Sequence, residues 1–295
     1  MKVLITGANS YIGTRFEEWV SKYDEYEVST LDLLNSKWKS YDFSSFHTVL
    51  HVAAIVHKKE KKEDEPLYSK VNTELPYEVA KKAKEEGVRQ FIFMSSIAVY
   101  GLEGSLYSIC KIGQNTVVNP KTIYGKSKLE AEEKLQRLSN NKFNLVIIRA
   151  PMVYGSGCKG NYNFLHRIAC KTNIFPKINN MRSVLYIDNL CEFIRLIIDA
   201  EESGIFFPQD KTFFNTTETI ISIGKCNKKY IRVSALLGFI VSLIGVIKIS
   251  RLNKAFGSLV IEKTLSDTFE WKYCVAYRSN AIKVIENDIK KKYRL

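Results

Sequence analysis

Short apolar runs rich in β-branched residues alternate with longer amphipathic stretches through the first half of the chain. The short runs predict strands and the amphipathic stretches predict helices, because the two patterns match the periods of those elements. The predicted strands are residues 2–6, 27–31, 48–53, 90–95 and 145–149, and the predicted helices begin at residue 12, lie near 76–86 and follow residue 124. Strands separated by helices indicate βαβ units, and hence a parallel sheet with helices on both faces.

The alternation weakens after Tyr154, where Gly155, Gly157 and Gly160 indicate loops. One further strand and helix are predicted over residues 183–199, and no internal repeat is visible. We therefore predict an α/β protein with two parts. A doubly wound parallel sheet takes residues 1–154 with about 182–204, and a smaller, partly interleaved C-terminal domain takes residues 155–181 and 205–295.

The composition excludes several classes of protein. Of 295 residues, 45% are hydrophobic, which supports a sizeable core and excludes a disordered, collagen-like or disulfide-stapled chain. The six cysteines form no Cys-x-x-Cys pair and no histidine stands at metal-ligand spacing from them, so no metal site is predicted. The N-terminus enters the first predicted strand without a signal peptide, and we expect a reducing, cytoplasmic location.

The net charge of +13 suits an anionic ligand, nucleic acid or an acidic membrane surface. Seven cations and no acid lie between Thr219 and Ile261, around an uncharged apolar run over residues 233–247. The run is shorter than the roughly 20 residues that span a bilayer, so we expect a buried or interfacial helix. The basic residues follow no recognition-helix or base-stacking pattern, and nucleic acid is not an expected partner.

A phosphate-binding loop is predicted directly after the first strand, in the sequence Thr-Gly-Ala-Asn-Ser-Tyr-Ile-Gly over residues 6–13. Gly7 permits a tight turn and Gly13 permits close packing of helix on strand, while Ser10 takes the place of the usual middle glycine. Tyr11 and Ile12 open the helix, whose free N–H groups suit a pyrophosphate. An ordinary turn is the alternative reading of this glycine pair. In the context of a strand and a helix, the loop predicts a Rossmann-like, dinucleotide-binding sheet.

An acidic residue follows the second predicted strand at the spacing expected for a ribose ligand. Asp32 can accept hydrogen bonds from both adenosine ribose hydroxyls and would repel a 2′-phosphate. It therefore favours NAD(H) as cofactor, with NADP(H) as the alternative, although a solvated aspartate at a strand end is also common. Asp42 and Phe43 are expected to flank the adenine.

Ligands of an open parallel sheet lie beyond the carboxyl ends of its strands. The small residues Val52, Ala53 and Ala54 follow the third strand there, and Ser96 follows the fourth with a hydroxyl for a reacting oxygen. A tyrosine and a lysine four residues apart share a helical face, where the ammonium can lower the pKa of the phenol.

Three such pairs occur in the chain, namely Tyr77/Lys81, Tyr107/Lys111 and Tyr124/Lys128. We favour Tyr124/Lys128, because it opens the helix after the fourth strand and can reach Ser96.

Taken together, residues 6–13, 51–54, 95–101, 124–128 and 149–155 resemble the extended short-chain dehydrogenase/reductases, the NAD-dependent epimerase/dehydratase family of nucleotide-sugar enzymes. Residues 160–161, 178–186 and 256–259 are similar to those of capsule-biosynthesis reductases that act on UDP-4-keto-6-deoxy-N-acetylhexosamines.

The resemblance implies a role for each matching residue. Tyr124 would be the general acid/base, Lys128 its electrostatic partner and ribose ligand, and Ser96 the hydroxyl on the C4 oxygen. Asn72 and Pro151 would lie at the cofactor. Substrate binding would fall to Ser96 and to Asn161, Arg182 and Arg251, with Arg182 on the substrate diphosphate. A homodimer, common in the family, is also expected.

The 4,6-dehydratases of this family carry an Asp-Glu pair after the catalytic hydroxyl residue, where this chain has Ile97 and Ala98. Dehydration is therefore not expected. We favour reduction of the C4 ketone of a UDP-4-keto-6-deoxy-N-acetylhexosamine in surface polysaccharide biosynthesis. A UDP-hexose or UDP-N-acetylhexosamine 4-epimerase is the alternative, and a non-catalytic NAD-binding protein is the weaker one.

The basic segment over residues 225–254 has two interpretations. In the first, it is a lid helix packed on the substrate domain, with Arg251 or Lys254 near the nucleotide phosphates. In the second, its exposed face makes a peripheral contact with an anionic cytoplasmic membrane.

Overall fold

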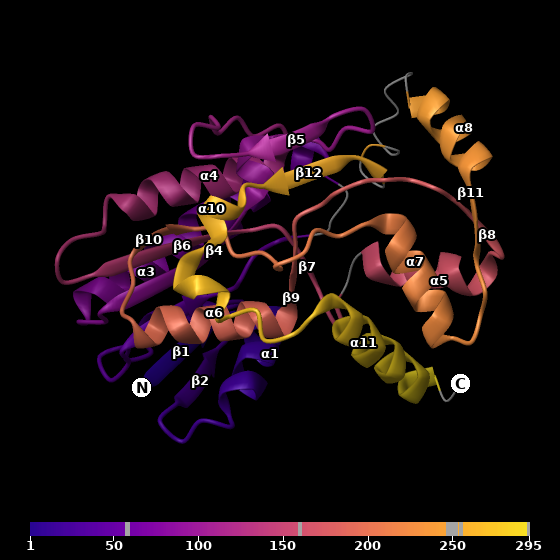
Figure 1. Ribbon diagram of the computed structural model, residues 1–295. Helices are drawn as coiled ribbons and strands as arrows, with labels where there is room; N and C mark the ends of the chain where they lie inside the picture. The colour runs from indigo at the N-terminus through magenta and orange to yellow at the C-terminus, as the bar shows by residue number, and fades with distance from the viewer. Residues whose placement is uncertain (57–59, 159–160, 246–252, 254–255, 294–295) are drawn as a thin grey trace.

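The computed structural model describes residues 1–295 apart from 57–59, 159–160, 246–252, 254–255 and 294–295. Within the described residues, a six-stranded sheet forms the centre of the molecule, and all its strands are parallel (Figure 1). In spatial order they are β2 (Glu27–Leu31), β1 (Lys2–Thr6), β3 (Thr48–His51), β4 (Gln90–Ser96), β6 (Asn144–Ala150) and β10 (Gly204–Phe206). This arrangement confirms the predicted α/β class.

The direction in which strands are added reverses between β1 and β3. The carboxyl ends of these two strands therefore define the point at which ligands of such sheets bind. The third strand ends at His51, two residues before its predicted end, because the N–H groups of Val52 and Ala53 both turn toward the Thr6 carbonyl.

Helices cover both faces of the sheet. They include α1 (Tyr11–Val20), α3 (Leu75–Glu85), α4 (Ile123–Gln136) and α6 (Ile187–Asp199). Along β1, Val3 and Ile5 pack into the core beneath α1 and α6, whereas Leu4 packs into the opposite core beneath α3 and α4. The period-two alternation of side chains in a strand thus fills two separate cores. Shorter helical segments connect these elements: η1 (Ser36–Ser40), η2 (Lys62–Asp64), α2 (Glu65–Tyr68), η3 (Ser69–Glu74) and η4 (Ile97–Tyr100).

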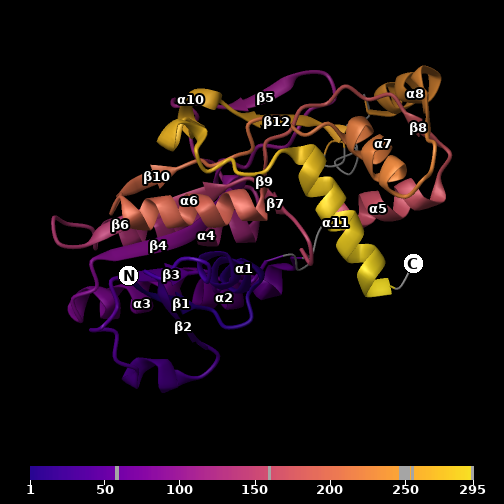
Figure 2. The ribbon, with the colours of Figure 1, turned by 60° about the horizontal axis from the view of Figure 1, so that its bottom comes forward.

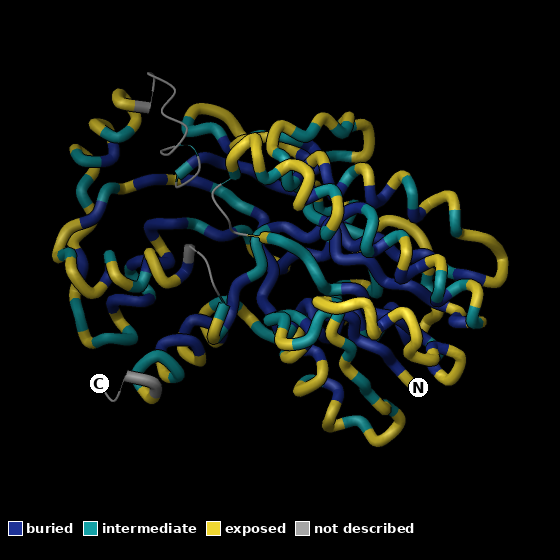
Figure 3. The backbone as a smooth tube through the Cα atoms, turned by 180° about the vertical axis from the view of Figure 1, so that it is seen from behind, coloured by how far each residue is buried: buried dark blue, intermediate teal, exposed yellow. Residues whose placement is uncertain are grey.

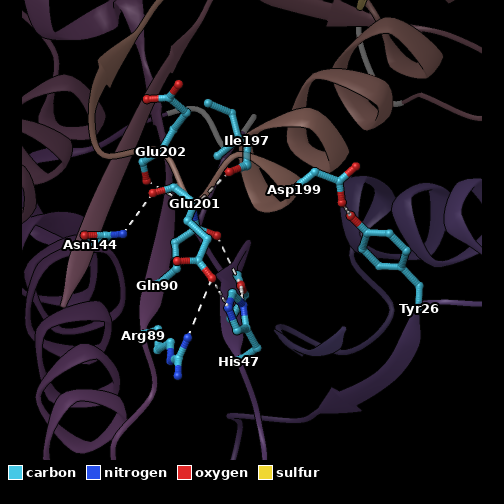
Figure 4. Close-up of polar contacts among 10 residues, drawn as sticks. Tyr26, His47, Arg89, Gln90, Asn144, Ile197, Asp199, Glu201 and Glu202 are labelled. Atoms are coloured by element: carbon cyan, nitrogen blue, oxygen red, sulfur yellow. Dashed lines mark hydrogen bonds and ion pairs between the residues drawn. The ribbon is translucent and has the colours of Figure 1, made fainter. Parts of the chain in front are cut away.

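The amino ends of the strands are tied to the turn between α6 and β10 (Figure 4). Gln90 donates to the carbonyls of Ile197 and Glu202, each at 3.0 Å, and Asn144 donates to the Glu201 carbonyl at 2.8 Å. The His47 ring lies 2.8 Å from the Glu201 carboxylate. These polar contacts therefore stabilise the amino ends of the strands, whereas the predicted site lies at their carboxyl ends.

The remaining elements form a second group, most of which lies beyond the carboxyl ends of the strands, while its residues 268–271 pack on α6. Its helices are α5 (Asn161–Lys171), α7 (Thr216–Cys226), α8 (Ala235–Gly245), α10 (Lys263–Ser266), η5 (Thr268–Trp271) and α11 (Arg278–Tyr293). Its strands pair two by two: β7 (Met152–Tyr154) with β9 (Val184–Tyr186), β8 (Ile174–Pro176) with β11 (Arg232–Ser234), and β5 (Ile109–Ile112) with β12 (Ser258–Ile261). Helix α11 lies beside α5 and α7, away from the sheet (Figure 2).

The chain passes between the two groups more than once. After β9 it returns to the sheet through α6, where Asp188 accepts from Arg15 and Glu192 accepts from Trp19, each at 2.9 Å. It then adds β10 to the edge of the sheet and leaves again.

Within the apolar run, residues 235–245 form helix α8, but this helix is not buried. Among the residues of α8 whose exposure is described, Gly238 alone is buried, while Leu236 and Phe239 are 69% and 61% exposed (Figure 3). The helix packs on β8 by its Gly238 side only. No helix in the described part of the chain is long and apolar enough to cross a membrane.

Candidate active site

The phosphate loop is built around two positions that tolerate no side chain. Gly7 has a φ of +120°, and a Cβ there would lie 2.7 Å from the backbone nitrogen of Ala53. A Cβ on Gly13 would lie 2.6 Å from the Ser10 hydroxyl. Ser10 is the N-cap of α1, and its hydroxyl oxygen accepts from the Gly13 N–H at 3.2 Å. The residue in the middle glycine position therefore stabilises the helix start, which presents its remaining N–H groups to an anion.

Tyr11 and Ile12 follow as the first residues of α1. The Tyr11 hydroxyl is buried beside Gly155 and finds no hydrogen-bond partner among the described residues. Burial raises the pKa of this phenol far above its usual value. An unsatisfied buried hydroxyl between the phosphate loop and the loop at residues 155–158 is a feature that a bound polar ligand would complete.

The two acidic candidates differ in their surroundings. Asp32 is exposed at the carboxyl end of β2, and its carboxylate accepts from the Leu34 N–H at 2.8 Å. Asp42 is also exposed, and hydrogen bonds from Ser44 lower its pKa. Phe43, by contrast, is fully buried in the core beneath α3 and α4, because its ring fills the space beside Trp38. Its ring is not available to flank an adenine, so that expectation is wrong.

The strand-end residues 52–54 are half-buried, as an approach to a cofactor requires. Asn72 is completely buried and acts as a brace: its side chain bonds both backbone groups of Ile55 and donates to the Ser127 hydroxyl at 3.2 Å. Asn72 therefore joins the segment after β3 to α4. Pro151 is buried between β6 and β7.

The predicted catalytic residues meet at the carboxyl end of β4. Helix α4 begins after Thr122, whose hydroxyl accepts from the Gly125 N–H at 3.0 Å. The phenol of Tyr124 lies close to the hydroxyl of Ser96, the last residue of β4. One turn further, Lys128 is 2% exposed and donates to the Met94 carbonyl at 2.8 Å. The Ser96 hydroxyl, the Tyr124 phenol and the Lys128 amine thus lie together at the carboxyl end of β4.

Burial dominates the protonation of this group. It raises the pKa of Tyr124 to about 12, although the nearby Ser96 hydroxyl acts to lower that pKa. It lowers the pKa of Lys128 to about 7, although the carboxylate of Glu132 acts in the other direction. The expected lowering of the phenol pKa by the ammonium is not present here, since Lys128 bonds a backbone carbonyl.

The other two tyrosine-lysine pairs lie elsewhere. Tyr107 is 59% exposed and donates to the Ser242 carbonyl, and Lys111 belongs to β5, so this pair does not share a helical face. Tyr77 and Lys81 lie on α3, and Lys81 is exposed. Neither pair reaches the end of β4.

A buried charge network lies directly behind the catalytic residues and was missed in the sequence. Glu132 is 1% exposed and accepts from Ser95 and from the Nε and Nη2 of Arg149, the latter at 2.6 Å. Arg149 also donates to the Tyr100 hydroxyl at 2.8 Å. The one available signal was the position of Glu132, four residues after Lys128 on the same helical face.

A second missed residue is Glu60, which belongs to a run of mixed charge in the sequence. Its carboxylate accepts from the N–H groups of Ile123 at 2.8 Å and Tyr124 at 3.3 Å. A carboxylate at this position stabilises the first turn of α4 and so fixes the start of the catalytic helix.

The predicted substrate residues are only partly described. The backbone of Arg182 exchanges hydrogen bonds with Phe214, and burial lowers the pKa of its guanidinium. Asn161 is the first residue of α5, and Arg251 lies outside the described residues. In the described part of the chain no three His, Cys, Asp or Glu side chains gather as metal ligands would.

Several known proteins are similar to this chain in sequence or in fold. UDP-glucose 4-epimerase of Vibrio cholerae is 32% identical over 242 residues, which cover 74% of this chain and 73% of that protein. N-acetyl-α-D-glucosaminyl-diphospho-ditrans,octacis-undecaprenol 4-epimerase of Escherichia coli O157:H7 is 27% identical over 96% of this chain and 88% of its own. UDP-2-acetamido-2,6-β-L-arabino-hexul-4-ose reductase of Pseudomonas aeruginosa is 29% identical over 69% of this chain and 51% of its own.

The crystal structure of UDP-glucuronic acid 4-epimerase from Bacillus cereus with NAD superimposes with a TM-score of 0.75, at 18% identity, over 99% of this chain and all of that one. The model of the NAD dependent epimerase/dehydratase family matches residues 3–206. Apart from Lys2, this span contains the phosphate loop, the predicted catalytic residues and all strands of the central sheet. The chain therefore belongs to the NAD-dependent epimerase/dehydratase family.

Proposed function

We propose that this protein moves a hydride to and from C4 of a diphosphate-linked hexose or N-acetylhexosamine. The observation that carries the proposal is the approach of the Tyr124 phenol to the Ser96 hydroxyl at the end of β4, with Lys128 one turn away. When bound, NAD supplies the hydride acceptor and donor at this edge.

Each residue has a role that its chemistry allows. Tyr124 takes the proton of the C4 hydroxyl as the ketone forms and returns it when the ketone is reduced. Ser96 donates a hydrogen bond to the same oxygen, and the buried Lys128 would hold the cofactor ribose in place. Asp32, Gly7 and the start of α1 would hold the adenosine ribose and the pyrophosphate.

The residues beside Ser96 limit the reaction. Ile97 and Ala98 form the first turn of η4 and carry no acid or base, so nothing there removes a C5 proton or protonates a leaving C6 hydroxyl. Hydride transfer without dehydration fits this site.

The two candidate reactions differ in what is consumed. An epimerase returns the hydride to the opposite face of C4, so that cofactor and sugar show no net redox change. A reductase converts a 4-keto sugar to its alcohol and consumes one NAD(P)H for each turnover. Relatives of both kinds support these readings. We place epimerisation first, which reverses our sequence-based preference, because the relative that is aligned along nearly the whole chain is an epimerase.

The diphosphate carrier is either UDP or a polyprenol. The first is the carrier named for the Vibrio cholerae and Pseudomonas aeruginosa relatives, and the second is named for the Escherichia coli one. Arg182, half-buried in the second group of elements, is our candidate for the diphosphate in either case, since a guanidinium binds phosphate oxygens bidentately. We also propose a cytoplasmic homodimer.

A substrate panel tests the proposal. The enzyme is incubated with UDP-GlcNAc, UDP-glucose, UDP-4-keto-6-deoxy-GlcNAc and polyprenyl-diphospho-GlcNAc, with and without added NADH or NADPH. Conversion without added cofactor indicates an epimerase, and stoichiometric cofactor consumption indicates a reductase. Tyr124→Phe lowers turnover at least about 100-fold while NAD binding is retained. Tyr107→Phe and Tyr77→Phe are the matched controls, and equal losses in all three would contradict the assignment.

A further inference from the structure

Lys128 is a basic side chain in surroundings that disfavour charge. It is 2% exposed, and its nitrogen donates to the Met94 carbonyl at 2.8 Å and lies 4.4 Å from the centre of the Phe93 ring. A carbonyl oxygen and a ring face replace only part of the hydration that an ammonium group loses on burial. Burial accordingly lowers the pKa of Lys128 to about 7. A further charge nearby therefore decides which form of the side chain prevails near neutral pH.

Glu132 supplies a negative charge one helical turn after Lys128, on the same face of α4. It is 1% exposed and accepts from the hydroxyl of Ser95, whereas Lys128 donates to the carbonyl of Met94. The two side chains thus contact consecutive residues of β4 and lie side by side against that strand. The carboxylate of Glu132 acts to raise the pKa of Lys128, in opposition to the burial that lowers it.

The carboxylate of Glu132 is held in place from a second strand. Arg149 of β6 is the register partner of Ser95. Its Nε donates to both carboxylate oxygens, at 3.1 and 3.2 Å, and its Nη2 donates to one of them at 2.6 Å. These charge-assisted hydrogen bonds stabilise a carboxylate in the interior. A helix and two strands therefore fix the position of Glu132 relative to Lys128.

The other titratable groups that face Lys128 are uncharged at neutral pH. His51 of β3 is completely buried, and burial lowers its pKa to about 3. Tyr124 of α4, with Tyr68 of α2 beside it, is a neutral phenol, because burial raises its pKa to about 12. Among the described groups that act on Lys128, Glu132 is therefore the one that favours the charged form.

We propose that Glu132 is a positioning residue that keeps Lys128 in its ammonium form at the carboxyl end of β4. An ammonium group has three N–H donors, of which the Met94 carbonyl takes one, so two remain for the hydroxyls of a cofactor ribose. A neutral amine would have one donor fewer and no charge. The use of the ammonium group in the reaction rests on the proposed function, whereas the effect of Glu132 on Lys128 does not.

Titration of Lys128 in the full-length protein, without substrate or cofactor, tests the inference. With ¹³C-labelled lysine, the Cε resonance of Lys128 gives the pH midpoint at which the side chain loses its proton, and its absence in Lys128→Met assigns it. Glu132→Gln lowers this midpoint by at least about one pH unit, because the charge that favours the ammonium form is removed. Glu132→Asp keeps a carboxylate and lowers the midpoint by less than about half a unit. The control Glu85→Gln, at an exposed ion pair on α3, leaves the midpoint unchanged.

Two further variants separate the charge of Glu132 from the stability that its ion pair contributes. Arg149→Met breaks the same pair but keeps the carboxylate, so the midpoint does not fall. Glu132→Leu/Arg149→Met leaves no lone charge buried but lacks the carboxylate, so the midpoint falls about as far as in Glu132→Gln. An unchanged midpoint in Glu132→Gln, or an equal fall in Arg149→Met, would overturn the inference.

The pH dependence of turnover connects the titration with the reaction. If the ammonium form is the active one, turnover falls as pH rises through the midpoint of Lys128, and in Glu132→Gln this fall moves to lower pH by the same amount as the midpoint. A midpoint that moves while the basic limb of turnover stays in place would contradict the proposed role of Lys128 and leave the assignment of Glu132 intact. Failure of the inference and failure of the proposed function are thus read from different measurements.

Discussion

The buried pair of Glu132 and Arg149 yields a prediction whose size follows from the structure. Glu132→Gln keeps the shape of the side chain but removes its charge. The Arg149 side chain, 10% exposed, then keeps its full charge in the interior and faces an amide whose NH₂ group competes with its own donors. Removing one partner of a buried pair typically costs about 3–5 kcal/mol, because the remaining charge is left uncompensated.

Thermal unfolding measures this cost. At about 2 °C for each kcal/mol in a chain of this size, the midpoint falls by roughly 6–10 °C. The matched control is Glu85→Gln, which removes an exposed pair with Lys81 at 3.8 Å and changes stability by less than about 0.5 kcal/mol. The double variant Glu132→Leu/Arg149→Met restores part of the loss, since no lone charge remains buried. Equal effects of Glu132→Gln and Glu85→Gln would refute the reasoning.

Three further predictions concern cofactor binding and pH. Gly7 and Gly204 share a φ of +120°, but only a Cβ on Gly7 would meet other atoms. Gly7→Ala therefore weakens NAD binding by at least roughly tenfold in calorimetric titration, whereas the control Gly204→Ala leaves NAD binding unchanged. Asp32→Ala lowers the preference for NADH over NADPH by roughly tenfold in steady-state kinetics, because a charge-assisted hydrogen bond to the ribose is lost. An identical effect of Asp42→Ala would contradict the assignment of Asp32 to the ribose. Burial lowers the pKa of His51 to about 3, whereas an unfolded histidine titrates near 6.5, so between these values the unfolded chain binds a proton that the folded chain does not. The unfolding free energy therefore falls with decreasing pH in this window by up to about 1.4 kcal/mol per unit, and His51→Gln, which cannot titrate, makes the acid limb shallower; an unchanged slope would disprove this account.

Sequence patterns were most informative where local geometry leaves few choices. The two glycines of the phosphate loop could be found because backbone and side-chain atoms stand where their Cβ atoms would be. Tyr124 could be selected from three pairs because a helix that follows a parallel strand begins at the carboxyl edge of the sheet. The core strands could be found because their apolar residues form short continuous runs.

Other features depend on contacts between distant segments. Phe43 is a core residue because the chain after η1 folds back under α3, and no local pattern distinguishes that from an exposed loop. Glu60 stabilises α4 from a segment some 60 residues earlier in the chain. The apolar sequence of α8 predicted a helix but not how far the helix is exposed. Its exposure depends on the backbone contact of Gly238 with Lys177, which comes from a distant part of the chain.

The pairing of β5 with β12 has a consequence for how the chain reaches its final form. Ile109 and Ser258 are register partners across roughly 150 intervening residues, so this pair closes one of the longest loops in the molecule. During synthesis, β5 leaves the ribosome long before β12 is made, so β5 stays unpaired until then. A fragment that ends at residue 206, where the family match ends, contains β5 without this strand. The part of the chain that the family model matches is therefore not completed by its own residues, because the partner strand of β5 lies among the last forty residues of the chain.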